Sequence, residues 1–195
     1  MTARPRLLFS TAPFFRQPLR EAYRHGADAG FEAVEIMVTQ DPATQEPHQL
    51  ARLAREVGLA VPAIHAPFLL VTRRVWGTSP VGKIYRAVHL AESVGASLVV
   101  VHPPYRWQVR YRVWIEESLA EYSRATGVTV AVENMFPWRA RGRELMAYLP
   151  HWDPVGQSYE HVTLDLSHTA TAGADSLSPS ENARPPVSAM RITRK

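Results

Sequence analysis

The chain reads Val81-Gly-Lys-Ile-Tyr-Arg-Ala-Val-His-Leu-Ala-Glu-Ser-Val94, then Gly95-Ala96, then Ser97-Leu-Val-Val-Val-His102. The first part has the apolar spacing of a helix, and the last part is the Val-rich run of a buried strand. Glycine at position 95 suits a helix end, because a residue without Cβ easily adopts the left-handed C-cap conformation. A helix followed at short range by a buried strand indicates a βα repeat and a parallel sheet.

The same order of helix, glycine and strand occurs three more times in the chain. The expected helices are residues 19–29, 48–57 and 114–125, and the strands that follow them are residues 33–38, 61–65 and 128–133. Two further strands are expected at residues 6–10 and 161–166, so the six strands begin at intervals of about 30 residues. This regular spacing predicts about six βα units.

Six such units suit either a doubly wound sheet or most of a (β/α)8 barrel, which takes about 250 residues. No Gly-x-Gly-x-x-Gly or Walker loop follows any strand, which favours the barrel. Two more units would need about 60 residues after position 166, and only 29 remain. We therefore predict an incomplete α/β barrel of the TIM type over residues 1–173, followed by a disordered or aberrant Ser- and Pro-rich tail over residues 174–195.

Composition excludes several classes of protein. The chain has 195 residues and no cysteine, so disulfides, thiolate catalysis, zinc fingers and iron–sulfur clusters are ruled out. No run approaches the roughly 20 apolar residues of a membrane helix, and the first residues lack a secretory signal, so we expect a cytoplasmic protein. The net charge of +4 favours anionic ligands without naming one.

Polar side chains lie at the expected carboxyl ends of the strands, where the functional face of a parallel α/β fold is found. They are Glu35, His65, His102, Glu133, Asp165 and His168. Imidazole and carboxylate groups on one rim are what a divalent metal needs, and they could also serve acid–base chemistry.

Each of these residues also has a purely structural interpretation. His65 and His102 stand just before prolines and could bond a loop backbone, while Glu35 could pair with an arginine. Asp165 could be an N-cap. Glu133 is harder to explain this way, because a carboxylate that ends a buried strand is costly unless it is paired or bound to metal.

Five short motifs follow one another along the chain: Phe31-Glu-Ala-Val-Glu35, Ile64-His-Ala-Pro67, Val99-Val-Val-His102-Pro103, Val130-Ala-Val-Glu133-Asn134 and Leu164-Asp165-Leu-Ser-His168. In this order they resemble the motifs of the xylose-isomerase-like barrels. This superfamily includes sugar and sugar-phosphate isomerases and epimerases, as well as the endonuclease IV-like family 2 AP endonucleases.

The resemblance implies a divalent metal (Mn, Mg, Co or Zn) held by Glu133 and Asp165. Glu133 is also implied as the catalytic residue that exchanges a proton next to the substrate carbonyl, through an enediolate. His168 is implied to contact substrate oxygens. His65 and His102 stand where isomerases use substrate contacts and where the nucleases have zinc ligands.

The sequence departs from the family after strand 6. Family members add a histidine from strand 7 and a glutamate from strand 8, and this chain has no counterpart for either. We expect a sugar or sugar-phosphate isomerase- or epimerase-like protein in which this chain alone does not assemble the family's two-base proton relay.

Two alternatives stay open. The first is an abasic-site nuclease, because arginines follow several expected strands and Arg106–Trp114 interleaves arginine with aromatic residues that suit nucleic acid; the same spacing also fits an ordinary amphipathic helix. The second is a non-catalytic barrel that self-associates through its open edges, strands 1 and 6.

Overall fold

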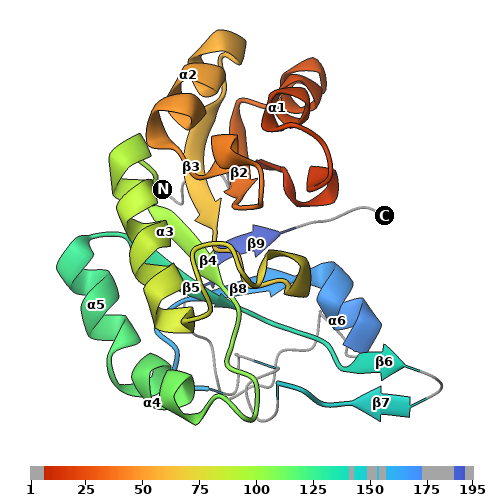
Figure 1. Cartoon of the computed structure of the whole chain (residues 1–195), viewed down its shortest axis with the longest axis vertical. Helices are drawn as coiled ribbons and strands as arrows, with labels where there is room; N and C mark the ends of the chain where they lie inside the picture. Colours follow the sequence, from red (N-terminus) through yellow and green to blue (C-terminus); the bar gives the residue numbers. More distant parts are fainter. Residues whose placement is uncertain (1–6, 141–142, 149–152, 154–156, 173–186, 192–195) are drawn as a thin grey trace, which may run out of the picture. The chain divides into compact units, whose positions relative to one another are not determined.

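The computed structural model describes residues 7–140, 143–148, 153, 157–172 and 187–191. Its contacts divide the chain into two compact units, Met1–Val99 and Val100–Lys195. Each unit is built of strands and helices that alternate along the chain (Figure 1). Among the described residues, no helix is both long and apolar enough to cross a membrane.

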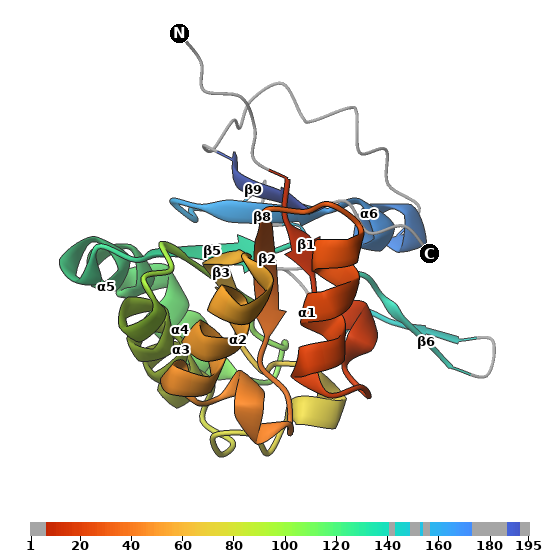
Figure 2. The same cartoon turned by 90° about the horizontal axis from the view of Figure 1, so that it is seen from above.

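The first unit contains three parallel strands with helices packed against them. The strands are β1 (Phe9–Ser10), β2 (Ala33–Met37) and β3 (Ala60–His65), paired in that order. The helices are α1 (Leu19–Asp28), α2 (Pro47–Val57) and α3 (Pro80–Val94), and the 3-10 turns are η1 (Ala12–Phe14), η2 (Pro42–Thr44) and η3 (Leu70–Thr72). Figure 2 shows α1, α2 and α3 on one side of these strands. Every residue of β2 is buried, as expected for a parallel strand.

Local sequence explains where these helices begin and end. Gly58 and Gly95 end α2 and α3 with φ of 74°, the left-handed conformation that glycine tolerates. The carboxylate of Asp41 accepts the Leu19 amide at 2.8 Å, so a residue of the β2–α2 connection satisfies the first turn of α1.

One buried lysine organises the loop after β3. Lys83, on α3, is 4% exposed and donates from Nζ to the carbonyl oxygens of Pro67, Arg73 (3.0 Å) and Thr72 (3.3 Å). Burial lowers the pKa of Lys83 to about 8. Three backbone carbonyls that a loop would otherwise leave to water are therefore satisfied by one ammonium group.

The second unit carries the remaining predicted strands. Its elements are α4 (Val109–Glu117), α5 (Leu119–Thr126), β5 (Thr129–Glu133), β6 (Trp138–Ala140), β7 (Arg143–Leu145), β8 (Val162–Asp165), α6 (Leu166–Ala172) and β9 (Val187–Arg191), and β4 (Leu98–Val101) crosses the boundary between the units. Strands β5, β8 and β9 pair in parallel, whereas β6 and β7 form an antiparallel hairpin (Figure 1). The glutamate and the aspartate singled out in the sequence end β5 and β8.

The predicted fold class is confirmed: the chain forms parallel strands and helices of an incomplete TIM-barrel type. Three features differ from the expectation. The helix expected at residues 114–125 is split in two, because Ser118 leaves the helical conformation at φ −122°. The hairpin β6–β7 was not expected, since its strands are only three residues long.

The third difference lies in the expected irregular tail. Residues 187–191 form β9, which pairs with β8 from Val162↔Val187 to Asp165↔Arg191. A Val-Ser-Ala-Met run is able to add to a strand edge despite its Ser- and Pro-rich surroundings. The edge of β8, which the sequence analysis expected to be open, is consequently covered by β9. The other residues of the tail lie outside the described residues.

Candidate metal centre

Three residues of the second unit bring possible metal ligands together. Glu133 ends β5, Asp165 ends β8, and His168 lies in the first turn of α6. One ligand atom from each lies within 4.8 Å of the others. Glu133 is fully buried and Asp165 is 3% exposed, while His168 is half-buried. We call these three residues the Glu133–Asp165–His168 cluster.

Asp165 uses its two carboxylate oxygens differently. Its Oδ1 accepts the amides of Ser167 (2.8 Å) and His168 (3.2 Å), which caps the N-terminus of α6. Its Oδ2 lies 3.8 Å from Nε2 of His168. Asp165 is thus an N-cap, as one interpretation of the sequence held, and it also faces the other members of the cluster.

A backbone contact fixes the orientation of the His168 ring. Nδ1 of His168 lies 2.7 Å from the carbonyl oxygen of Asn134, which can only accept, so Nδ1 carries the proton. In the neutral ring, Nε2 then keeps its lone pair and is available as a ligand. The ring of Phe136 packs against the imidazole at 4.7 Å between centroids.

Asn134 connects the ends of β5 and β8, a role that the sequence analysis missed. Its Oδ1 accepts the Asp165 amide at 2.6 Å, and its Nδ2 donates to the Asp165 carbonyl at 3.1 Å and to Thr169 Oγ1 at 3.0 Å. The only signal in the sequence is its place directly after Glu133. Asn134 therefore positions both the aspartate and, through its own carbonyl, the histidine.

His102 and an aromatic group lie near Glu133. Nε2 of His102 is 3.3 Å from Oε2 of Glu133, and Tyr111 donates to the His102 carbonyl at 2.7 Å. Burial raises the pKa of Tyr148 above its ordinary range, with smaller contributions from Tyr105 and from the charge of Glu133.

Tyr148 belongs to an aromatic cluster that follows β4 and β5. Tyr105 stacks on Tyr148 at 4.6 Å and on Trp107 at 4.9 Å between ring centroids, and Trp138 meets Tyr148 edge-on at 6.1 Å. Trp107 is 56% exposed, whereas Tyr148 is buried. The cluster links a buried phenol near Glu133 to an exposed indole.

The residues present fit a divalent cation. Two carboxylates buried this close together repel each other unless a cation or a proton lies between them. Carboxylate oxygens with an imidazole nitrogen are a donor set that Mn, Mg, Co and Zn accept. The buried Glu133–Asp165–His168 cluster has that set, with a histidine tautomer fixed for binding.

The other predicted residues lie in the first unit. His65 ends β3, is buried, and has Nδ1 3.0 Å from the Ala66 carbonyl, which is the loop-backbone contact that the sequence left open. Glu35 accepts a hydrogen bond from Ser10 Oγ at 2.9 Å. This bond comes from a hydroxyl group, where the sequence analysis considered an arginine.

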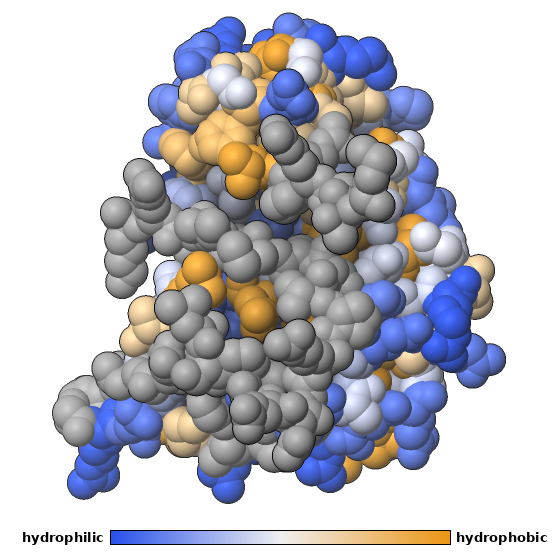
Figure 3. Space-filling model, turned by 180° about the vertical axis from the view of Figure 1, so that it is seen from behind, coloured by the Kyte–Doolittle hydropathy of each residue, from blue (hydrophilic) through white to orange (hydrophobic). Residues whose placement is uncertain are grey.

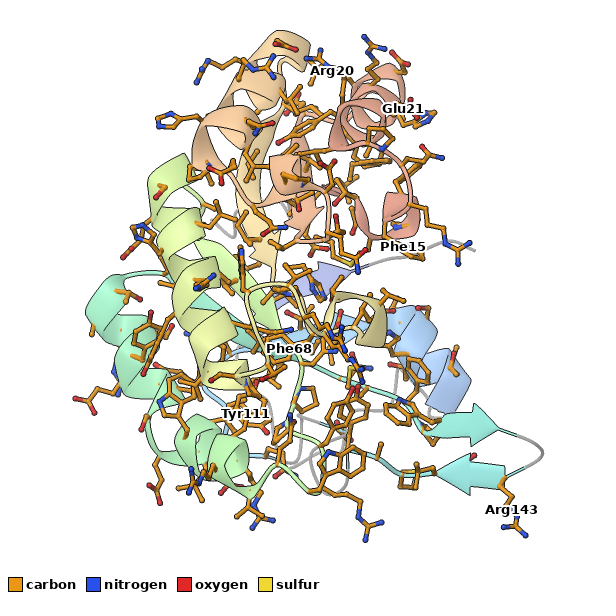
Figure 4. All side chains as sticks on the ribbon, in the orientation of Figure 1. Phe15, Arg20, Glu21, Phe68, Tyr111 and Arg143 are labelled. Carbon is orange, nitrogen blue, oxygen red and sulfur yellow. The ribbon has the colours of Figure 1, made fainter. Side chains whose placement is uncertain are left out.

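The arginines that follow the strands are mostly exposed where their side chains are described, as for Arg73, Arg106 and Arg110. Arg143 on β7 points away from the ribbon (Figure 4). Figure 3 shows both hydrophilic and hydrophobic side chains among the coloured residues of one face.

Most of the chain matches a known family. The sequence model of the xylose isomerase-like TIM barrel family matches residues 23–193. The chain belongs to this family. The match extends past residue 173, where the sequence analysis ended the barrel, and it includes β9.

Relatives of this xylose isomerase-like protein occur in mycobacteria. Uncharacterized proteins of Mycobacterium leprae and of Mycobacterium tuberculosis are each 41% identical over 187 residues, covering 86% of this chain. The chain spans 67% of the length of either relative.

Solved structures share the fold at low sequence identity. A D-tagatose 3-epimerase-like protein has a TM-score of 0.66 at 19% identity, covering 95% of this chain and 75% of that one. A 3-keto-D-glucoside 4-epimerase from E. coli has a TM-score of 0.61 at 15% identity, covering 96% and 78%. A family 2 AP endonuclease from Brucella melitensis has a TM-score of 0.54 at 13% identity, covering 87% and 90%.

Proposed function

We propose that this xylose isomerase-like protein is a divalent-metal-dependent isomerase or epimerase of a small sugar or sugar phosphate. The observation that carries the proposal is the buried Glu133–Asp165–His168 cluster, whose ligand atoms lie within 4.8 Å of one another. Glu133, Asp165 and Nε2 of His168 would hold the metal. A metal bound there polarises a substrate carbonyl, which acidifies the neighbouring C–H group.

Glu133 is the residue we assign to proton transfer. Its carboxylate removes the proton from the carbon beside the carbonyl and returns it to the adjacent carbon, while a hydroxyl proton moves between the two substrate oxygens. His102, 3.3 Å away, orients the carboxylate. Isomerisation by this route needs one base, whereas inversion at a single carbon needs a second group on the opposite face, so the cluster favours isomerisation.

The remaining assignments concern substrate contacts. The family resemblance implies His168 as a contact to substrate oxygens, but Nδ1 is bonded to the Asn134 carbonyl, so with Nε2 on the metal we assign His168 as the third metal ligand. His65 and His102 are proposed as substrate contacts, as the family resemblance implies.

The first test is metal content. Purified wild-type protein and Glu133→Gln are dialysed against Mn²⁺, Mg²⁺, Co²⁺ or Zn²⁺ and measured by elemental analysis. We expect near-stoichiometric metal in wild type and a loss of at least tenfold in Glu133→Gln. Equal metal content in the two proteins, or none in either, would contradict the proposal.

The second test follows the proton. Ketohexoses and ketose phosphates are incubated with metal-loaded protein in D₂O, and deuterium at the carbon beside the carbonyl is followed by NMR. We expect incorporation with wild type only. Incorporation that persists in Glu133→Gln would remove Glu133 from its catalytic role.

The same preparations separate the alternatives. Binding of abasic-site DNA with an affinity that falls steeply with salt would favour the nuclease, for which the exposed arginines are the supporting observation. Association without metal uptake would favour the non-catalytic, self-associating barrel.

A further inference from the structure

Thr163 is a buried polar residue beside the cluster, and the sequence analysis did not consider a role for it. It lies in β8 two residues before Asp165, so both side chains project from the same face of the strand. The register Glu133↔Thr163 places it beside Glu133 on the neighbouring parallel strand, facing the same side. Thr163 therefore lies next to Glu133 and on the same face of the strands as Asp165.

The hydroxyl group of Thr163 is fully buried and makes no hydrogen bond within the described part of the chain. A threonine in a helix can bond a backbone carbonyl of the preceding turn, as Thr171 of α6 does when it donates to the carbonyl of Ser167 at 2.7 Å. A strand offers no such carbonyl, since its carbonyls face neighbouring strands; that of Thr163 accepts the Asn134 amide.

A buried hydroxyl without a partner is unfavourable, and valine would fill the same volume without that cost. The hydroxyl of Thr163 lies beside the Glu133 carboxylate, at the face where the cluster would hold a ligand. A ligand held by Glu133 and Asp165 would bring an oxygen atom to this face of the strands, within reach of Thr163.

We propose that Thr163 binds an oxygen-bearing ligand, either a water molecule or a hydroxyl group of the substrate, beside the Glu133 carboxylate. This inference rests on the proposed function of the same cluster and adds a binding residue to it. The hydroxyl can donate to the ligand oxygen and accept from it, which suits an O–H group better than a carbonyl or a phosphate.

Two substitutions at one position provide the test. Thr163→Val removes the hydroxyl at nearly constant volume, and Thr163→Ser keeps it. Thr126→Val is the matched control, because that hydroxyl on α5 donates to the Tyr122 carbonyl at 3.1 Å. Each protein is titrated calorimetrically with Mn²⁺ alone, and then, saturated with Mn²⁺, with D-fructose.

We expect Thr163→Val to weaken one of the two titrations by about threefold to tenfold, while Thr163→Ser and Thr126→Val stay within about twofold. Weaker Mn²⁺ binding identifies a water molecule beside the metal, and weaker fructose binding alone identifies a substrate hydroxyl. Melting of the EDTA-treated proteins gives a further readout: Thr163→Val keeps or raises the melting temperature, whereas Thr126→Val lowers it.

Unchanged affinities for both Mn²⁺ and fructose in Thr163→Val would overturn the inference. A melting temperature lowered as in Thr126→Val would show that the hydroxyl bonds within the protein. Glu133→Gln, titrated alongside, separates the two failures. If Glu133→Gln loses Mn²⁺ and Thr163→Val does not, only the role of Thr163 is wrong; if Glu133→Gln binds as wild type does, the proposed function fails too.

Discussion

At the scale of single residues, the candidate centre depends on side chains that serve the fold and the site together. Asp165 caps α6 with one oxygen and faces Glu133 and His168 with the other. The side chain of Asn134, at the end of β5, accepts a hydrogen bond from the Asp165 amide at the end of β8, and its backbone carbonyl fixes the His168 tautomer. Positioning of this kind keeps ligand atoms in place before any metal arrives.

The two tasks of Asp165 can be separated by substitution. Asn caps a helix about as well as Asp, so Asp165→Asn should keep the free energy of unfolding within about 1 kcal/mol of wild type. Asp165→Ala should lose about 1–2 kcal/mol with the cap. Both should bind Mn²⁺ at least tenfold more weakly, because each lacks the charged oxygen.

Urea unfolding and calorimetry of the metal-free and titrated proteins measure these effects. Wild-type Mn²⁺ affinity in Asp165→Asn would show that Asp165 is a cap and no ligand.

At the scale of elements, the loop after β3 depends on a lysine that α3 contributes. Lys83 bonds three carbonyls of the loop, and its pKa is lowered to about 8 by burial. Between pH 8 and the ordinary value of 10.5, the unfolded chain keeps a proton that the folded chain has lost. The free energy of unfolding therefore rises with pH across this window.

We expect the difference in unfolding free energy between wild type and Lys83→Met to shift in favour of wild type by about 1–2 kcal/mol from pH 7.5 to pH 9.5. Urea titrations at the two pH values measure it, and the difference between the proteins cancels groups common to both. A shift of zero or of opposite sign would mean that burial does not control this amine.

A helix end provides a second prediction at this scale. Gly95 ends α3 at φ 74°, and a Cβ built there meets nothing within 4 Å. The cost of Gly95→Ala is therefore that of the left-handed backbone alone, about 1 kcal/mol in thermal or urea unfolding. Gly95→Asn should cost less, because asparagine tolerates this conformation; equal losses would point to another cause.

The repeat of helix, glycine and strand was sufficient to predict strands β1 to β5 and β8, because glycine C-caps and Val-rich strands are local signals. The break between α4 and α5 and the strand β9 were not predicted. Three-residue strands such as those of the hairpin β6–β7 carry no such periodicity. In the candidate centre, the carboxylates and His168 could be predicted from their places at strand ends. The hydrogen bonds between the Asn134 side chain and the backbone of Asp165, and the place of the buried Thr163 hydroxyl beside Glu133, depend on strand register. Hydrophobic periodicity does not determine this register.

At the scale of the whole molecule, β9 covers the edge of β8, the strand that carries Thr163 and Asp165. An uncovered edge exposes amide and carbonyl groups that recruit other chains. A chain that ends at residue 186 should therefore associate more strongly than the full chain. Light scattering across micromolar concentrations measures this association. The same oligomeric state for both chains would show that β9 does not protect the edge of β8 from other chains.

The stacked rings of Tyr105, Tyr148, Trp107 and Trp138 have an optical consequence. The stack runs from the buried phenol of Tyr148, whose pKa is raised mainly by burial and in part by the charge of Glu133, to the exposed indole of Trp107. Indole fluorescence depends on the polarity and the electric field around the ring. Tryptophan emission, measured with and without added Mn²⁺ in wild type and in Trp107→Phe, is therefore the label-free signal with which to look for occupancy of the carboxylate site.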